Sequence, residues 1–155
     1  MSLQAHPSPN SAFSALDSVA GCATDLWLLI GRVLLCWVFL ATAWGHVNGI
    51  GGFTNYLTSL NAPAPQLMAY IGTAAEVIIA VTLLFGVATR YGAAVAILFL
   101  IISTALAHRY WEYPAAQVMG QYNNFLKNLA ILGGMIYVFV FGPGRFSVDR
   151  AIGNK

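Results

Sequence analysis

Four apolar stretches dominate this sequence, and each is long enough to cross a membrane as a helix. A helix of about 20 residues spans the ~30 Å hydrocarbon core of a bilayer. Only 8% of the residues are charged, against about 25% in an ordinary soluble domain. We therefore predict an all-α membrane protein, a bundle of four transmembrane helices. The four predicted spans cover residues 26–46, 65–87, 91–108 and 121–141.

The segments between and around the spans suggest how the chain is organised. Apolar residues at helical spacing predict short helices over 12–23 and 53–60, and we expect both to lie at the membrane surface. Residues 88–90 join the second and third spans so tightly that these two helices must be antiparallel neighbours. The chain is thus expected to comprise a polar N-terminal tail, a transmembrane domain and a C-terminal tail, at residues 1–25, 26–142 and 143–155.

The basic residues predict how the bundle is oriented. Four spans place both termini on the same side of the membrane, and that side carries four basic residues against one, Arg109, on the other. Cytoplasmic connections are enriched in Lys and Arg, so both termini are expected in the cytoplasm. The four residues on the terminal side are Arg90, Arg145, Arg150 and Lys155.

Other features argue against several classes of protein. The net charge is only +2, and no cluster of Lys and Arg could follow a phosphate backbone, so we expect no nucleic acid partner. Cys22 and Cys36 lack the spacing of a disulfide framework or of a zinc site. The N-terminal segment before the first span contains no Lys or Arg, and no cleaved signal peptide is expected.

The second span contains one carboxylate, Glu76, within the sequence TAAEVIIAVTLLFG. A charge near the middle of a bilayer costs at least ~2.5–3.5 kcal/mol unless it is paired, hydrated or protonated. Gly72 and Ala80 lie one turn before and after Glu76 and allow another helix to approach closely. Glu76 is therefore expected to face the bundle interior. Arg32 and Lys127 both lie at a suitable depth to be its cationic partner, and the sequence leaves that choice open.

Further polar residues are predicted to share the bundle interior with Glu76. On the first span, Arg32 begins a stripe at alternating spacings of four and three residues, which places its members on one helix face. Other polar side chains cluster towards the outer ends of the third and fourth spans, so that a polar column open to the outside is expected. The stripe comprises Arg32, Cys36, Phe39, Ala43 and His46, and the outer residues are Thr104, His108, Asn124, Lys127 and Asn128.

Several motifs together resemble the DoxX family of small bacterial and archaeal membrane proteins. They are Glu76 in a small-residue helix, LNAPAP at 60–65, LLFGVATRYGA at 83–93, His108 at the end of the third span and FGPGRFSVDR at 141–150. The family takes its name from a subunit of an archaeal quinone-linked oxidase, and some members work in membrane oxidoreductase complexes. The resemblance covers nearly all of residues 26–150, and it implies a multi-pass protein of the cytoplasmic (inner) membrane with a connection to quinone redox chemistry.

The resemblance and the polar residues together suggest an integral membrane subunit of a quinone-linked redox system, which would either bind a small quinone or dock a soluble electron-donating partner on its outer loops. A quinone site needs an apolar slot, hydrogen-bond donors for two carbonyl oxygens and a group that exchanges protons. We expect Glu76 to handle protons and His46 and His108, with Asn124, to bind the quinone head group. Arg32 and Lys127 would set the local electrostatic potential. The expected partners are the lipid bilayer, other membrane or redox subunits, and further copies of the chain.

Alternative interpretations remain open at this level. An Arg32–Glu76 pair could serve packing alone, Lys127 could extend to the interface, and the histidines could be interfacial. The chain would then be a structural or assembly subunit of a larger membrane complex. A haem or metal centre between His46 and His108 has no supporting CxxCH or HExxH motif. A carrier is disfavoured because four spans are few and no broken helix marks a substrate site.

Overall fold

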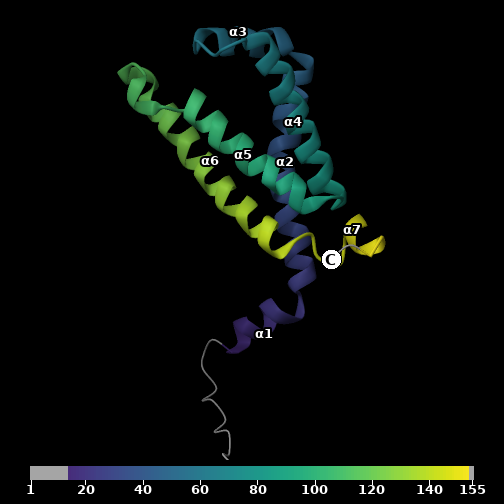
Figure 1. Cartoon of the computed structure of the whole chain (residues 1–155). Helices are drawn as coiled ribbons and strands as arrows, with labels where there is room; N and C mark the ends of the chain where they lie inside the picture. The colour runs from purple at the N-terminus through teal and green to yellow at the C-terminus, as the bar shows by residue number, and fades with distance from the viewer. Residues whose placement is uncertain (1–13, 154–155) are drawn as a thin grey trace, which may run out of the picture.

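The computed structural model describes residues 14–153, and in this part of the chain all regular structure is helical (Figure 1). The prediction of an all-α, four-helix membrane bundle is confirmed, because four helices are long and apolar enough to cross a bilayer. The long helices are α2 (Thr24–Asn48), α4 (Pro65–Phe85), α5 (Thr89–Ala107) and α6 (Ala115–Phe141). The short ones are α1 (Ser14–Cys22), α3 (Ile50–Ser59), the 3₁₀ helix η1 (Tyr110–Glu112) and α7 (Val148–Ala151).

The helix bounds differ from the predicted spans mainly at the start of α6. Pro114 is extended and precedes the first helical residue, Ala115, whereas the predicted span begins at residue 121. The six additional residues, AAQVMG, include the strong helix formers Ala, Gln and Met. A helix can therefore begin before the chain reaches the apolar layer. The first thirteen residues of the predicted N-terminal tail lie outside the described part of the chain.

Helix α3 lies across one end of the bundle, opposite the end that carries α1 and α7 (Figure 1). It begins three residues before the helix predicted over 53–60. Leu57 is its buried residue, and it packs with Ala62 and Ala69 in a small apolar cluster beside the main core. Helix α3 is thus held against the first turns of α4. Its position at a membrane surface stays a prediction.

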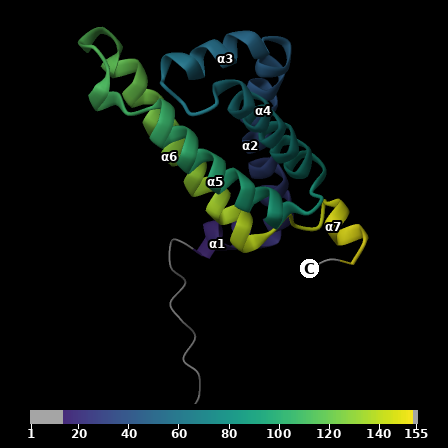
Figure 2. The ribbon, with the colours of Figure 1, turned by 45° about the horizontal axis from the view of Figure 1, so that its top comes forward.

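The long helices form two antiparallel pairs that diverge towards the α3 end. Helix α2 packs on α4 and helix α5 packs on α6, while α4 and α5 join the two pairs. Figures 1 and 2 show the α5–α6 pair leaning away from α2 and α4 as it approaches α3. The main core contains residues from all four helices, including Cys36, Ile79, Leu83, Ala96 and Met135. Cys36 is 2% exposed, as its place on the inward-facing stripe of the first span predicts.

The turn between α4 and α5 depends on a glycine. Gly86 ends α4 in the left-handed conformation, with φ of 65°, and its amide donates to the Thr82 carbonyl. A Cβ atom at Gly86 would clash with the guanidinium of Arg32. Both the backbone conformation and the packing therefore require glycine. The predicted antiparallel contact between these two helices follows from this turn and is confirmed.

The C-terminal segment folds back over this turn. Helix α6 stops before Gly142, which has φ of 74°, as the Gly-Pro-Gly sequence predicts. Arg32 donates hydrogen bonds to the carbonyl oxygens of Pro143 and Phe146, at 3.0 and 2.6 Å. Asp149 accepts from the backbone amides of Ala88 and Thr89, at 2.8 and 2.9 Å. These bonds tie α2, the α4–α5 turn and the end of α6 together.

We predict that Gly86→Ala lowers the free energy of unfolding by ~1–3 kcal/mol, because it combines a strained left-handed residue with a steric clash. Thermal unfolding of the protein in detergent, followed by intrinsic fluorescence, measures the change. Gly120→Ala is the matched control, because a Cβ at that helical position meets nothing within 4 Å. The control is expected to be neutral or stabilising. Equal melting temperatures for the two variants would contradict the prediction.

Candidate functional site

Glu76 lies in the bundle interior and pairs with a histidine. Only 3% of Glu76 is exposed, and its Oε2 lies 2.7 Å from Nδ1 of His46 on α2. The acid is therefore inward-facing, as its small-residue surroundings predict. Its partner is His46. The sequence had suggested Arg32 or Lys127 as the partner instead. One hydrogen lies between Nδ1 of His46 and Oε2 of Glu76. The other ring nitrogen of His46, Nε2, is therefore a second atom of the pair at which a proton can be exchanged.

An aromatic ring from α3 covers the histidine. Phe53 stacks on the His46 ring with centroids 3.8 Å apart and an interplanar angle of 6°. The side chain of His46 remains 30% exposed, whereas that of Glu76 is 4% exposed. The pair is thus accessible through the histidine and closed at the carboxylate.

An apolar cavity of about 390 Å³, with Phe53 among its lining residues, lies between α3, α4 and α5. Gly72 leaves space in its wall, because a Cβ at Gly72 would lie 3.5 Å from the Phe53 ring and 3.9 Å from the Phe99 ring. The hydroxyl-bearing residues of the lining are Tyr56 and Ser103. Its apolar lining includes Phe53, Leu57, Met68, Ile71, Val95, Leu98, Phe99, Ile102 and Leu106.

Tyr56 brings a hydroxyl group to the rim of this cavity, where it is hydrogen-bonded to Tyr113. Burial and the neighbouring Tyr113 hydroxyl raise the pKa of Tyr56 to about 12. The phenol therefore keeps its proton throughout the physiological pH range. Tyr113 itself donates to the carbonyl of Ala107 at 3.0 Å. Sequence reasoning did not select Phe53 or Tyr56, although their spacing of three residues on a short helix could have indicated a shared face.

Arg32 lies at the opposite end of the bundle from the His46–Glu76 pair. It is 2% exposed and is held by the C-terminal carbonyl groups. The Arg32 guanidinium lies beside Gly86 at the end of α4. Gly86 follows Glu76 by ten residues, which is about 15 Å along the helix axis. Arg32 faces the interior as its stripe predicts. The structure does not bring it to Glu76.

The polar residues near the α3 end of α5 and α6 bind one another. His108 Nδ1 lies 2.8 Å from Oε1 of Gln121, and Asn128 donates to the Thr104 hydroxyl at 2.9 Å. Both contacts join α5 to α6. The structure therefore divides the predicted polar column between two helix pairs, with His46 and Glu76 on one and His108 on the other.

Lys127 lies on the side of α6 that faces α2. Gly134, seven residues after Lys127 on α6, packs against Leu35 of α2. Thr42 follows Leu35 by seven residues on α2. A separation of seven residues returns to nearly the same helix face. Lys127 and Thr42 are therefore on facing sides of two helices, in the region where these helices diverge. Lys127 is exposed and Asn124, one turn away, is half-buried.

The chain matches one family model and is similar to two bacterial inner membrane proteins. The family model described as DoxX matches residues 27–109. The chain is 32% identical over 130 residues to the inner membrane protein YphA of Escherichia coli K12, and the match covers 84% of this chain and 93% of YphA. It is 29% identical over 131 residues to the inner membrane protein YqjF of the same organism, covering 84% and 95% of the two chains.

A more distant similarity extends to a eukaryotic protein. The surfeit locus protein 4 homolog of Schizosaccharomyces pombe is 29% identical over 124 residues, which is 79% of this chain and 36% of that protein. No solved structure matches the chain.

We predict that Glu76→Ala lowers the free energy of unfolding by ~1–3 kcal/mol, because it leaves a half-buried histidine nitrogen without its partner. The melting temperature in detergent measures the loss. Glu112→Ala is the matched control, since Glu112 pairs with Arg109 at 3.2 Å between half-exposed side chains and such pairs contribute little. If both variants melt like the unmodified protein, the His46–Glu76 contact contributes no net stability.

Proposed function

The chain belongs to the DoxX family, and from this membership we propose that it is a membrane subunit that binds a quinone beside the His46–Glu76 pair. The quinone would accept electrons from a partner redox protein. The histidine and the carboxylate would exchange the accompanying protons. The subunit would lie in the inner membrane with both termini in the cytoplasm, so that the pair and the cavity would lie in the outer half of the bilayer.

The observation that supports the proposal most directly is the position of Phe53. Its ring stacks on His46 and also lines the 390 Å³ apolar cavity. Cavities that bind small molecules commonly have volumes of about 300–1,000 Å³ and are lined mainly by apolar side chains with a few polar groups. One aromatic ring thus contacts both the proposed proton-exchanging pair and the apolar slot.

The chemistry of a quinone fits these groups. Reduction of a quinone to a quinol takes up two electrons and two protons, and its oxidation releases them. Ser103 donates to the Leu100 carbonyl at 3.3 Å and Tyr56 is hydrogen-bonded to Tyr113, so each hydroxyl would turn to a quinone carbonyl oxygen when the quinone binds. His46 would take up or release a proton at Nε2 and exchange one with Glu76 at Nδ1. The apolar cavity wall would hold the ring and the start of the isoprenoid tail.

The remaining candidate residues have other roles in this proposal. Lys127 and Asn124 face the region between α2 and α6, where a cation would raise the local electrostatic potential near the pair. His108 joins α5 to α6 through Gln121. Arg32 holds the C-terminal segment. Quinone contact is thus assigned to groups on α3, α4 and α5, the helices that line the cavity, while His46 on α2 stacks on Phe53.

A second candidate function is that of an assembly subunit, and the exposed surface of α6 favours it. Only 6% of the apolar stretch of α6 is buried within the chain, against 33% for α4. Large apolar side chains on its outer face include Ile136, Tyr137, Phe139, Val140 and Phe141. This surface can contact lipid, another membrane subunit or a second copy of the chain.

We predict that protein purified gently in native lipid contains about one quinone per chain, detected by mass spectrometry of organic extracts. Gly72→Leu places a side chain between Phe53 and Phe99, and we expect it to reduce the quinone content by about tenfold or more. Gly133→Leu is the matched control, because a Cβ at Gly133 meets nothing within 4 Å. A quinone-free protein that copurifies with larger membrane subunits would instead support the assembly function.

We further predict that Glu76→Gln preserves quinone content, because glutamine keeps a similar shape and an acceptor for the histidine. Quinone reduction by the purified complex should fall by about a hundredfold, the usual contribution of a positioned acid or base. The two measurements separate binding from proton exchange. Unchanged reduction in this variant would remove Glu76 from the proposed mechanism, whatever its effect on stability.

A further inference from the structure

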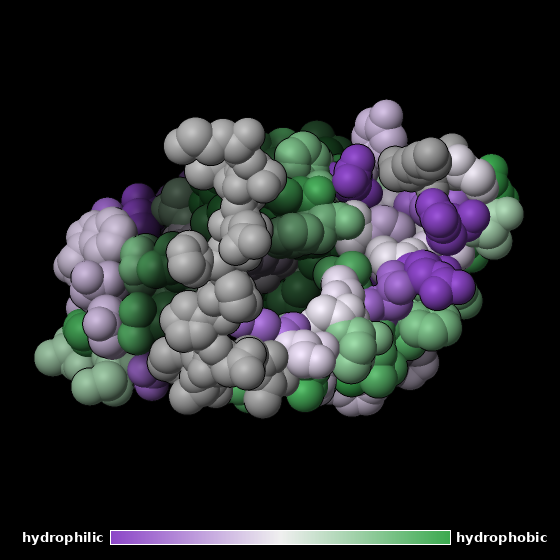
Figure 3. Space-filling model, turned by 90° about the horizontal axis from the view of Figure 1, so that it is seen from below, coloured by the Kyte–Doolittle hydropathy of each residue, from purple (hydrophilic) through white to green (hydrophobic). Residues whose placement is uncertain are grey.

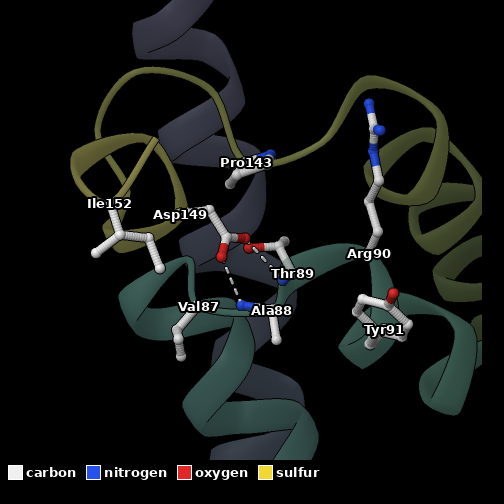
Figure 4. Close-up of a pocket in the computed structure, with 8 residues that line it drawn as sticks. All are labelled: Val87, Ala88, Thr89, Arg90, Tyr91, Pro143, Asp149 and Ile152. Carbon is white, nitrogen blue, oxygen red and sulfur yellow. Dashed lines mark hydrogen bonds between the residues drawn. The ribbon is translucent and has the colours of Figure 1, made fainter. Parts of the chain in front are cut away.

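Two adjoining hollows lie at the end of the bundle opposite α3, where the C-terminal segment meets the α4–α5 turn. One, of about 460 Å³, lies between that turn and α7 and includes Pro143 and Asp149 (Figure 4). The other, of about 320 Å³, follows the segment from Phe141 to Arg145. Arg90 contributes to both hollows, and Arg145 and Arg150 line the second.

The three arginines keep donors available for a ligand. Arg90 donates a single hydrogen bond, to the Val140 carbonyl at 3.3 Å, from an exposed side chain. Nε of Arg145 is 3.9 Å from Asp25. The side chain of Arg150 makes no hydrogen bond or ion pair with residues 14–153. Three guanidinium groups, each with five donors, thus surround one hollow.

The nearby carboxylates are already engaged. Asp25 accepts from the backbone amide of Arg145 at 2.8 Å. Asp149 binds the amides of Ala88 and Thr89, and Figure 4 shows its carboxylate directed at this turn while the Arg90 side chain extends away towards the C-terminal loop. The second hollow is therefore lined by three positive groups and one partly satisfied negative group.

The hollows lie at the depth of lipid head groups. Arg90 is the second residue of the membrane-spanning α5, and Gly142 directly follows the membrane-spanning α6. Exposed apolar side chains surround the arginines: Tyr91 is 80% exposed, Phe146 57% and Ile152 64%. Seen from this end, hydrophilic side chains gather beside hydrophobic ones (Figure 3). Such a mixture suits the boundary between head groups and acyl chains.

We propose that this basic hollow binds the phosphate of an anionic phospholipid. Arginine matches phosphate oxygens with paired, planar donors, and basic pockets between transmembrane helices attract acidic head groups. The exposed apolar residues favour a lipid over free phosphate, because they would contact the acyl chains of the same molecule. A bound lipid would connect the start of α5 with the end of α6 and the C-terminal segment. The site is separate from the His46–Glu76 pair and does not depend on the proposed quinone function.

Native mass spectrometry tests this proposal on the full chain. After equilibration in nanodiscs of equal parts phosphatidylcholine and phosphatidylglycerol, the protein should release with phosphatidylglycerol preferentially attached. We expect Arg90→Gln and Arg150→Gln each to weaken this preference by about fivefold. Arg109→Gln is the matched control, because Arg109 lies near the opposite end of the bundle and already pairs with Glu112. It should leave the preference unchanged.

Three results would overturn the proposal. One is equal retention of the two lipids, and another is an unchanged preference when Arg90 and Arg150 are both replaced. The third is binding of inorganic phosphate without any lipid preference, which would indicate a site for the free anion. If Arg90→Gln does not fold, Arg150→Gln decides, because the Arg150 side chain makes no hydrogen bond or ion pair with residues 14–153. Thermal unfolding of each variant identifies such a loss of fold.

Discussion

The bilayer supplies no water to its apolar core, so a buried polar group in this protein must find its partner within the chain. Three contacts of buried polar side chains lie at two levels of the bundle, one between the membrane-spanning helices and two at the end that carries α7. Glu76 pairs with His46, Arg32 binds two carbonyl groups of the C-terminal segment, and Asp149 binds two amides of the α4–α5 turn. Each contact joins elements far apart in the sequence. The arrangement of the four helices therefore depends on where these polar groups meet.

The two ends of the bundle differ because these contacts differ. At the end with α7, Arg32, Asp149 and the glycine turn hold all four long helices close together. At the α3 end, the α5–α6 pair leans away, and a small apolar cluster holds α3 on α4. The His46–Glu76 pair and the apolar cavity both lie towards the less constrained end. A ligand could enter there without opening the packed core.

The family match covers α2 to α5 and so includes both members of the His46–Glu76 pair. It does not include α6 or the C-terminal segment, which supply Lys127 and two of the three arginines of the basic hollow. The proposed quinone site thus rests on the matched helices, whereas the proposed lipid site depends on residues beyond them. The two proposed sites also differ in chemistry, since the first would exchange protons and the second would bind a fixed negative charge.

The sequence alone determined the four spans, the inward face of Arg32 and Glu76, and the end of α6 at Gly142, because hydrophobic length, helical period and glycine conformation are local properties. Only the tertiary structure decided that Glu76 meets His46, that Arg32 binds the C-terminal segment and that Phe53 joins the pair to a cavity. Helical period identifies the face on which a residue lies. Its partner on another helix depends on the axial shift between them, and one turn, about 5.4 Å, is enough to exchange one partner for another.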